Sequence, residues 1–391
     1  MFIKNYNKFL ESKNQKTMWD IIPNSVKVLH KLFTANNKKL YVVGGAVRDF
    51  LNNEKPKDFD LCTDATPDEV IDILKDYKTN LQGRAFGVVV VFTDDQPEGM
   101  EIATFREDVY DTKLGKSRNP NSVNFTTIDK DVKRRDITYN AMFFDLDKKE
   151  IVDLVGGQED IKNKITKFVG EPSERIIEDP LRILRILRFS CRYNFSIDEK
   201  TADAIKENAD TLNIISKERI YDEMKKAWKQ AKSYTTYLNY FIEFGLFEHI
   251  FPNALVNKEV KDCKFFVTYI ANLFKNDKLS DLEKRLIQTY KFDSDVVSKA
   301  LFLINLVNLS PDNAFNLFKM KNSSHCEDSI IIDWFNINDL NDNMFIKFLE
   351  YTPSVSAEEL MAKGIKGKEL GDTIKRMESD NFKKLIEINE N

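Results

Sequence analysis

Short apolar runs separated by turn residues fill residues 39–153, a pattern typical of β-strands. They predict strands at 39–43, 58–63, 88–92 and 101–104, and a hairpin that pairs 141–146 with 151–153. From Pro180 onward the apolar residues recur at three- and four-residue intervals, which predicts helices at 181–193, 202–212, 218–228 and 281–290. The pattern therefore predicts an α+β head followed by a long helical body.

Turn-rich stretches indicate where the chain divides. One contains Gly156-Gly157 and another contains Ser310-Pro311. The expected parts are a head over 1–154, a helical neck over 155–230, a helical body over 231–310 and a helical tail over 311–391. The chain has no repeat of fixed period and no low-complexity tract, which disfavours a regular solenoid.

Composition places the chain among folded proteins. Its 391 residues include 59 Lys and Arg against 63 Asp and Glu, and 42% of them are hydrophobic, so we expect two or three domains rather than disorder. No apolar run reaches the roughly 18 residues that cross a bilayer, and the N-terminus lacks a signal-peptide pattern. We therefore expect a cytoplasmic protein without a membrane segment. The net charge of −4 does not exclude a nucleic-acid partner, because phosphate binding depends on where the positive charges cluster.

The cysteines give no sign of a metal site or a disulfide. Cys62, Cys191, Cys263 and Cys326 lie far apart and form no CxxC pair, so neither a zinc ribbon nor a disulfide framework is indicated. We expect ordinary buried thiols.

A glycine pair stands between the first predicted strand and a predicted helix. Gly44-Gly45 lets backbone N–H groups approach a phosphate closely, and the helix start adds a favourable dipole. The segment lacks the GxxxxGK[ST] pattern of a Walker A loop. Taken alone, the same pattern also fits a common tight turn.

Two aspartates follow shortly after. In an extended strand Asp58 and Asp60 would point to the same face while Phe59 points into the core. Two such close carboxylates repel each other unless a cation lies between them, and oxygen ligands beside a phosphate-bearing substrate suit Mg²⁺. A solvated face of an edge strand is the alternative for an isolated DxD pattern.

Two more segments combine charge with a defined position. Arg135, Asp136 and Asn140 enter another predicted strand, where arginine can hold phosphate and the Asp and Asn side chains can bind ribose hydroxyls. Further on, Asp179 is a suitable N-cap and Pro180 a suitable first residue for a helix. That helix has an apolar face and a basic face with Arg182, Arg185, Arg188 and Arg192. A charged turn and an ordinary surface helix are the alternatives.

In order along the chain, these segments resemble the motifs of class II tRNA nucleotidyltransferases, the family of CCA-adding enzymes and bacterial poly(A) polymerases. The resemblance covers about residues 40–230. Its motifs are Gly44-Gly45-Ala46-Val47-Arg48-Asp49, Asp58-Phe59-Asp60, Arg134-Arg135-Asp136-Ile137-Thr138-Tyr139-Asn140-Ala141, Glu178-Asp179-Pro180-Leu181-Arg182 and Glu218-Arg219-Ile220-Tyr221-Asp222-Glu223.

The resemblance implies a polymerase-β-like nucleotidyltransferase head with a mixed sheet. It also implies that Asp58 and Asp60 bind two catalytic Mg²⁺ ions, which activate the RNA 3′-OH for in-line attack on the α-phosphorus of a nucleoside triphosphate. Glu101 is a candidate third carboxylate. Arg48 and the amides of Gly44 and Gly45 would hold the triphosphate.

The nucleotide contacts follow from the same resemblance. Arg135, Asp136 and Asn140 would contact the sugar and phosphates, which favours ribonucleotides. Asp179 and Arg182 would hydrogen-bond the base edge of CTP or ATP as a protein template. Arg185 and Arg188 would help with phosphates or with orienting the template, and the 218–223 motif would support the template helix.

Two other segments bear on the reaction and the RNA partner. Residues 104–120 look like the flexible loop that full CCA-adding and A-adding members carry, which argues against a CC-only enzyme. Near the C-terminus, Lys366 and Lys368 lie in a basic, Gly-containing turn that resembles the tRNA-binding tail of the family. A simple helix–loop–helix turn is the alternative.

The expected activity is therefore addition of CCA to the 3′ end of tRNA from CTP and ATP. The alternatives are a poly(A) polymerase or an A-adding enzyme, and then a non-catalytic RNA-binding relative. The short C-terminal end of mixed charge favours CCA addition, because poly(A) members often carry a strongly basic extension. The sequence does not indicate an oligomeric state.

Overall fold

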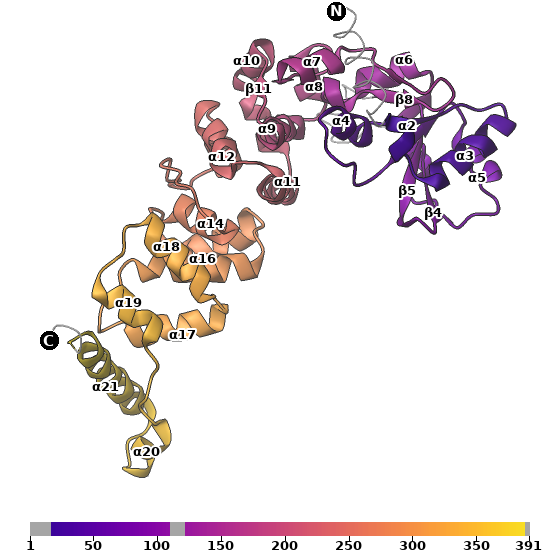
Figure 1. The fold of residues 1–391 in the computed structure, drawn as a ribbon. Helices are drawn as coiled ribbons and strands as arrows, with labels where there is room; N and C mark the ends of the chain where they lie inside the picture. The colour runs from indigo at the N-terminus through magenta and orange to yellow at the C-terminus, as the bar shows by residue number, and fades with distance from the viewer. Residues whose placement is uncertain (1–16, 110–121, 388–391) are drawn as a thin grey trace, which may run out of the picture. The chain divides into compact units, whose positions relative to one another are not determined.

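The computed structural model describes residues 17–109 and 122–387 of the chain. The chain forms two compact units, Met1–Ile215 and Ser216–Asn391, each with its own core. In Figure 1 the sheet of the first unit is drawn in indigo to magenta and the last helices of the second in orange and yellow. The expected boundaries after residues 154, 230 and 310 differ from this division and stay predictions.

A seven-stranded mixed sheet forms the centre of the first unit, in the order β3-β4-β5-β2-β1-β8-β9. β2 and β5 run parallel, and the other neighbours in the sheet are antiparallel. The strands are β1 (Leu40–Val43), β2 (Asp60–Thr63), β3 (Thr79–Asn80), β4 (Val88–Thr93), β5 (Gln96–Thr104), β8 (Phe143–Asp145) and β9 (Glu150–Val152). Two small ribbons pair β6 (Arg106–Val109) with β7 (Ser122–Phe125), and β10 (Ile165–Thr166) with β11 (Ser196–Ile197).

The central strand β1 is buried on both faces. All four of its residues are buried, as expected for a strand in the middle of a covered sheet. On one face Tyr41, Phe105 and Phe143 meet with ring centroids 5.7 to 6.4 Å apart, a favourable spacing for aromatic rings. The packing on both sides fixes the end of β1 and the turn that follows it.

Helices surround this sheet and continue the first unit to Ile215. The helix α9 matches its predicted range, because Pro180 precedes it and Asn194, with φ of 56°, ends it in the left-handed region. The helices are α2 (Met18–Ile21), α3 (Asn24–Ala35), α4 (Gly45–Leu51), α5 (Pro67–Ile73), α6 (Ile128–Asp131), α7 (Gly157–Asn163), α8 (Pro172–Glu178), α9 (Leu181–Tyr193) and α10 (Glu199–Glu207). The 3₁₀ turns are η1 (Arg84–Phe86), η2 (Val132–Arg134), η3 (Thr138–Asn140) and η4 (Ala209–Ile214).

The described part of the second unit is helical. Its core is rich in aromatic side chains, among them the fully buried Tyr237, Phe274 and Trp334. The helices are α11 (Lys217–Gln230), α12 (Tyr234–Glu243), α13 (Phe247–Ile250), α14 (Phe266–Phe274), α15 (Leu279–Lys284), α16 (Ser294–Leu306), α17 (Ala314–Ser324), α18 (Asp328–Ile337), α19 (Asn343–Glu350), α20 (Ala357–Ala362) and α21 (Gly367–Glu387), with a π-helical turn η5 (Arg285–Thr289).

A buried carboxylate joins the last helix to the segment that follows α19. Glu378 of α21 has no exposed surface. One of its oxygens accepts the backbone N–H groups of Ser354 and Val355 at 2.7 and 2.6 Å, and the other accepts the Tyr351 hydroxyl at 2.8 Å. The buried carboxylate thus accepts one side-chain and two backbone donors from this segment.

We expect Glu378→Ala to lower the free energy of unfolding of the second unit by about 3 kcal/mol, because the buried Tyr351 hydroxyl and two backbone N–H groups lose their acceptor. Glu378→Gln keeps an acceptor for the backbone N–H groups and should cost about 1 kcal/mol. Urea denaturation of both variants measures the difference. Equal stabilities would show that these hydrogen bonds contribute little.

The fold class is the predicted one: a mixed-sheet head followed by a helical chain. The predicted strands are found, with shifted ends, and β2 begins at Asp60 rather than at 58. The ribbon of β6 and β7 was not predicted, because β6 is mostly charged and the polar–apolar alternation of β7 extends over only four residues. Helix 281–290 is found as α15 followed by the π-helical turn.

Two further expectations concern membranes and cysteines. Among the helices that the structure describes, none has the length and apolar character needed to cross a membrane. The four cysteines are free; Cys62, Cys191 and Cys326 are buried as expected, whereas Cys263 is half-buried.

Candidate functional site

The two aspartates that the sequence singles out lie next to the glycine turn. Asp60 is the first residue of β2 and pairs with Val43, the last residue of β1, so Gly44 follows directly beside it. Asp58 precedes the strand in irregular backbone, and Phe59 between them is buried. Both aspartates are exposed. The pair is therefore formed by the strand start and the residue two before it, rather than by two residues of one strand.

Negative charges surround Asp60. Its side chain is exposed, but enough protein lies around it that burial, Glu101 and Asp58 raise its pKa to about 6, while Arg135 acts in the opposite direction. Glu101 is brought close by the parallel pairing of β2 with β5. No hydrogen bond or ion pair within the described residues neutralises the Asp60 carboxylate. A divalent cation held by oxygen ligands would relieve this repulsion, so the residues present fit such an ion.

The number of protein ligands also fits Mg²⁺. Within residues 17–109 and 122–387, no three His, Cys, Asp or Glu side chains are grouped as a metal cage. Mg²⁺ usually takes one or two carboxylates and completes its shell with substrate phosphates and water. A carboxylate pair open to solvent suits this use better than a fully protein-ligated ion.

The stability of the metal-free protein should reveal the repulsion at Asp60. Its pKa is about 6 in the folded protein against an ordinary value of 3.8, so the folded state binds more protons between these values and the free energy of unfolding falls as the pH rises through them. We expect Asp60→Asn to be more stable than wild type at pH 7 and equal to it below about pH 4. Thermal unfolding in EDTA across this range tests the prediction, which a pH-independent difference would contradict.

The turn after β1 requires glycine at its first position. Gly44 has φ of 69°, and a Cβ there would lie 3.3 Å from the Asn140 carbonyl oxygen. Its N–H donates to the Met142 carbonyl at 3.0 Å. A phosphate contact at this turn would therefore rest on the N–H of Gly45, which opens α4.

Arg48 of α4 is buried within the head. Its Nε and Nη2 donate to Asp49 at 2.9 and 2.7 Å, and its Nη1 donates to Asn140 Oδ1 at 2.6 Å. The guanidinium also lies 5.1 Å from the ring centroid of Phe189 and 5.3 Å from that of Tyr193. These contacts join α4 to α9 and η3. The predicted contact of Arg48 with triphosphate stays a prediction.

The polar residues that enter β8 bind side chains from two other elements. Arg135 donates from Nε and Nη2 to Asp131 at 3.0 and 2.9 Å. Asp136 accepts Arg185 Nε at 2.8 Å and its Nη2 at 2.6 Å. Burial alone would raise the pKa of Asp136, but Arg185 lowers it to about 2. The Asp136 carboxylate is thus held ionised by an arginine of α9.

The basic face of α9 is turned toward acidic partners. Arg182 is 8% exposed and donates from Nη1 to Glu178 at 2.6 Å and from Nη2 to the Arg134 carbonyl at 3.0 Å. Arg188 is buried and stacks on Phe189 at 4.3 Å. Arg192, at the end of the helix, approaches Asp49 at 3.3 Å. A solvated surface helix does not describe this face.

Asp179 lies between α8 and α9 in extended backbone. Its Oδ1 accepts the N–H of Leu181 at 3.3 Å and its carbonyl accepts the N–H of Arg182 at 3.0 Å. Pro180 already has helical φ and ψ. Asp179 therefore caps the start of α9, as its sequence position indicates, and lies three residues before Arg182.

The remaining predicted segments are the loop and the tail. Residues 104–109 end β5 and form β6, where Arg106 pairs with Asp108 at 2.9 Å; residues 110–120 of the predicted loop lie outside the described residues. Lys366 and Lys368 belong to the second unit, at the start of α21, and both are exposed. Their predicted RNA contact stays a prediction.

Sequence reasoning missed the acidic partners of the arginines. Asp131 holds Arg134 and Arg135, and Glu178 holds Arg182. The three- and four-residue spacing of these pairs was a usable signal. By contrast, the contact of Tyr193 with Asp49, at 2.7 Å and 144 residues apart, has no local signal.

Comparisons with known proteins agree on one family. Residues 40–167 match a model described as the poly(A) polymerase head domain, and residues 194–256 match the probable RNA- and SrmB-binding site of polymerase A. A CCA-adding enzyme of Staphylococcus saprophyticus is 34% identical over 278 residues, which cover 67% of this chain and 67% of that protein.

Poly(A) polymerase I of Salmonella typhimurium is 35% identical over 241 residues, which are 60% of this chain and 50% of that protein. The match with this chain thus spans about half the length of that polymerase. The fold resembles that of the Bacillus stearothermophilus CCA-adding enzyme in complex with CTP, with a TM-score of 0.69 and 24% identity, covering 96% of this chain and 98% of that chain.

Proposed function

Since the chain belongs to the family of CCA-adding enzymes and bacterial poly(A) polymerases, we propose that it adds C, C and A, from CTP and ATP, to the 3′ end of tRNA. The observation that carries the proposal is the placement of Asp58 and Asp60 beside the Gly44 turn, with Arg135 acting electrostatically on Asp60. The similarity to CCA-adding enzymes over two thirds of the chain supports the substrate assignment.

Members of this family generally use divalent metal ions, and we assign Mg²⁺ to Asp58 and Asp60. The bound metal would favour deprotonation of the RNA 3′-OH and neutralise charge on the phosphates. The reaction forms a bond from the 3′-oxygen to the α-phosphorus and releases pyrophosphate. It needs no covalent link between protein and nucleotide.

The chain's own residues would bind and orient the nucleotide. Arg135 would bind phosphate; its guanidinium is held by Asp131 and acts electrostatically on Asp60, which supports this role. Asp136 and Asn140 would bind the ribose hydroxyls, which ribonucleotides offer and deoxyribonucleotides lack in part. An arginine that is already held in place loses less conformational entropy when the nucleotide binds, so less of the binding energy is spent on ordering its side chain.

Base choice would come from the start of α9. Asp179 provides acceptors and Arg182 a planar set of donors, complementary to the mixed edges of cytosine and adenine. The two residues are three apart in the sequence, and the Asp179 carbonyl accepts the backbone N–H of Arg182. In this proposal Arg185 and Arg188 help to place them, and Gly45 and Arg48 border the phosphates.

The RNA would be held in part by the second unit. Lys366 and Lys368 are exposed cations at the start of α21, and lysines of this kind contact phosphates without regard to sequence. We assign them to the tRNA backbone. This contact is expected to weaken with rising salt concentration.

Poly(A) or single-A addition is the second candidate. The observation that favours it is the 35% identity to a poly(A) polymerase and the match of the head to a poly(A) polymerase model. A non-catalytic RNA-binding relative is disfavoured because both aspartates and the arginines around them are present together.

The test is an incubation of the protein with Mg²⁺, a tRNA that lacks its 3′ CCA, and each nucleoside triphosphate alone or in combination. Growth by C, C and A that then stops supports the proposal. Long A tracts on any RNA would replace it with poly(A) addition, and no growth under any condition would contradict both. A tRNA that already ends in CCA is the matched control and should not be extended.

A further inference from the structure

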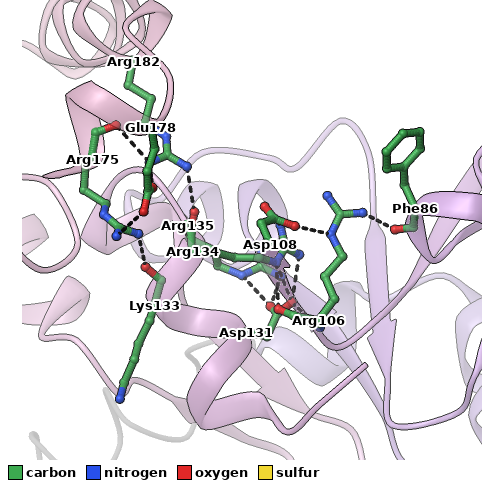
Figure 2. A network of polar contacts seen from close by, with 10 residues as sticks. All are labelled: Phe86, Arg106, Asp108, Asp131, Lys133, Arg134, Arg135, Arg175, Glu178 and Arg182. Carbon is green, nitrogen blue, oxygen red and sulfur yellow. Dashed lines mark hydrogen bonds and ion pairs between the residues drawn. The ribbon is translucent and has the colours of Figure 1, made fainter. Parts of the chain in front are cut away.

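One buried carboxylate links the residues assigned to phosphate and base. Asp131 is the last residue of α6 and is 1% exposed. Its Oδ1 accepts Arg134 Nε at 2.9 Å and the N–H of Arg106 at 3.1 Å, and its Oδ2 accepts Arg135 Nε and Nη2 at 3.0 and 2.9 Å. Figure 2 shows Asp131 between these arginines.

The charges explain why this carboxylate stays ionised. Burial would raise the pKa of Asp131, but Arg135 and Arg134 hold it below its ordinary value. Each of the two guanidinium groups is in turn more than three-quarters buried. Removal of the carboxylate would leave two neighbouring cations without their shared partner, a costly arrangement.

Asp131 is linked through Arg135 to the part of the sheet that carries Asp60. Arg135 lies over the ring of Phe143 at 4.9 Å and acts electrostatically on Asp60. With Asp131 on one side and the Phe143 ring beneath it, the Arg135 guanidinium is fixed in both position and plane. Phe143 belongs to β8, the neighbour of β1, so this path is anchored in the central sheet.

Asp131 is also linked to Arg182, the arginine assigned to base recognition. The carbonyl oxygen of Arg134 accepts Arg182 Nη2 at 3.0 Å, and the carbonyl oxygen of Lys133 accepts Arg175 Nη1 at 2.6 Å. Arg175 and Arg182 share Glu178, at 2.5 and 2.6 Å. The main chain of 133–134, which Asp131 holds through the Arg134 side chain, is therefore tied to both α8 and α9 (Figure 2).

We propose that Asp131 is a positioning residue that couples Arg135 to Arg182, so that placement of the phosphates and choice of the base are set together. This inference rests on the proposed function. Asp131 touches neither the nucleotide nor the metal in this assignment. It acts through Arg134, the last residue of η2, through Arg135, which directly follows η2, and through the peptide of Arg134.

The proposed coupling predicts specific changes in the kinetics of nucleotide addition. A displaced Arg135 lowers the transfer rate for every nucleotide, whereas a displaced Arg182 changes the ratio between correct and incorrect bases. A residue that only stabilised the fold would lower the amount of active protein and leave that ratio unchanged. The ratio therefore separates positioning from a purely structural role.

The experiment compares wild type, Asp131→Asn and Asp131→Glu in single-turnover addition of CTP and of UTP to tRNA lacking CCA. We expect Asp131→Asn to lower kcat/KM for CTP up to about 100-fold, as small misplacements of reacting groups do, and to lower the CTP-to-UTP ratio about tenfold. Asp131→Glu keeps the charge but shifts the guanidinium groups. Compared with Asp131→Asn, it should recover part of kcat/KM for CTP and a smaller part of the CTP-to-UTP ratio.

A double-mutant cycle tests the coupling directly. Asp131→Asn combined with Arg182→Lys should change the CTP-to-UTP ratio by less than the product of the two single effects, because Arg182→Lys removes the guanidinium group that Asp131→Asn displaces. Strictly multiplicative effects would overturn the coupling. If Asp131→Asn does not fold, Asp131→Glu carries the same readout and the same cycle.

The matched control is Asp277→Asn in the second unit, which also removes a buried carboxylate from an arginine, here Arg285 at 3.0 Å. It should lower stability and leave the nucleotide ratio unchanged. A wild type that transfers no nucleotide contradicts the proposed function itself. A wild type that transfers CTP, with the ratio unaltered in both Asp131 variants, contradicts only the present inference.

Discussion

Asp60→Asn is expected to lower the rate of CTP and ATP addition by about 10³-fold or more, because loss of metal-held charge stabilisation costs several kcal/mol in the transition state. The asparagine keeps the size of the side chain and removes the charge that repels Glu101 and Asp58. Folding should therefore not suffer, and the affinity for tRNA should stay within about twofold, since the phosphate contacts lie elsewhere.

Rapid-quench kinetics measure the transfer rate, and filter binding measures the affinity for tRNA. Asp64→Asn is the matched control: Asp64 directly follows β2, is exposed, and accepts the N–H of Lys39 at 2.8 Å. It should retain the wild-type rate. Turnover by Asp60→Asn close to that of wild type would remove Asp60 from the metal site, whereas equal losses in both variants would point to a general charge effect.

Arg182→Ala is expected to lower kcat/KM for CTP and ATP by more than 10²-fold, the loss typical of removing one preorganised donor. We also expect a smaller ratio of kcat/KM for CTP and ATP to kcat/KM for UTP and GTP. It also leaves two carbonyl acceptors, those of Arg175 and Arg134, without this donor. We therefore expect a loss of about 2 kcal/mol in the free energy of unfolding. Glu178 keeps Arg175 as a partner.

Arg182→Lys separates selection from folding. Lysine keeps the positive charge opposite Glu178 but cannot reproduce the planar set of donors. Base selection should fall nearly as far as in Arg182→Ala while most of the stability returns. Arg285→Lys, at a similarly enclosed arginine of the second unit, is the control for the substitution itself. Unchanged base selection in Arg182→Lys would remove Arg182 from the template.

The local signals in the sequence predicted much of the fold. The range of α9 was predicted correctly because a proline before it, an apolar face and a residue able to adopt positive φ after it are all local features. The strands β1, β2 and β4 were found because apolar runs in a covered sheet are continuous. The start of β2 was misplaced by two residues, since pairing with β1 and not the identity of Asp58 decides where the ladder begins.

The surroundings of the site residues were less accessible to prediction. The sequence shows the helical spacing of the arginines on α9. This spacing does not predict whether those arginines face solvent or acidic side chains. Asp136 reaches Arg185 across 49 positions and Asp49 reaches Tyr193 across 144. Such partners are brought together only when the sheet and α9 pack.

The order of side chains along the chain determined which residues are candidates for the chemistry of this protein: a glycine turn, two aspartates and a series of arginines at helical spacing. Packing decided what each of them does in the folded head. Desolvation and the closeness of Glu101 raise the pKa of Asp60, and the closeness of Arg185 lowers that of Asp136, although both are aspartates of one sequence. Electric interactions depend on distance in space, and distance in space is fixed by the tertiary structure.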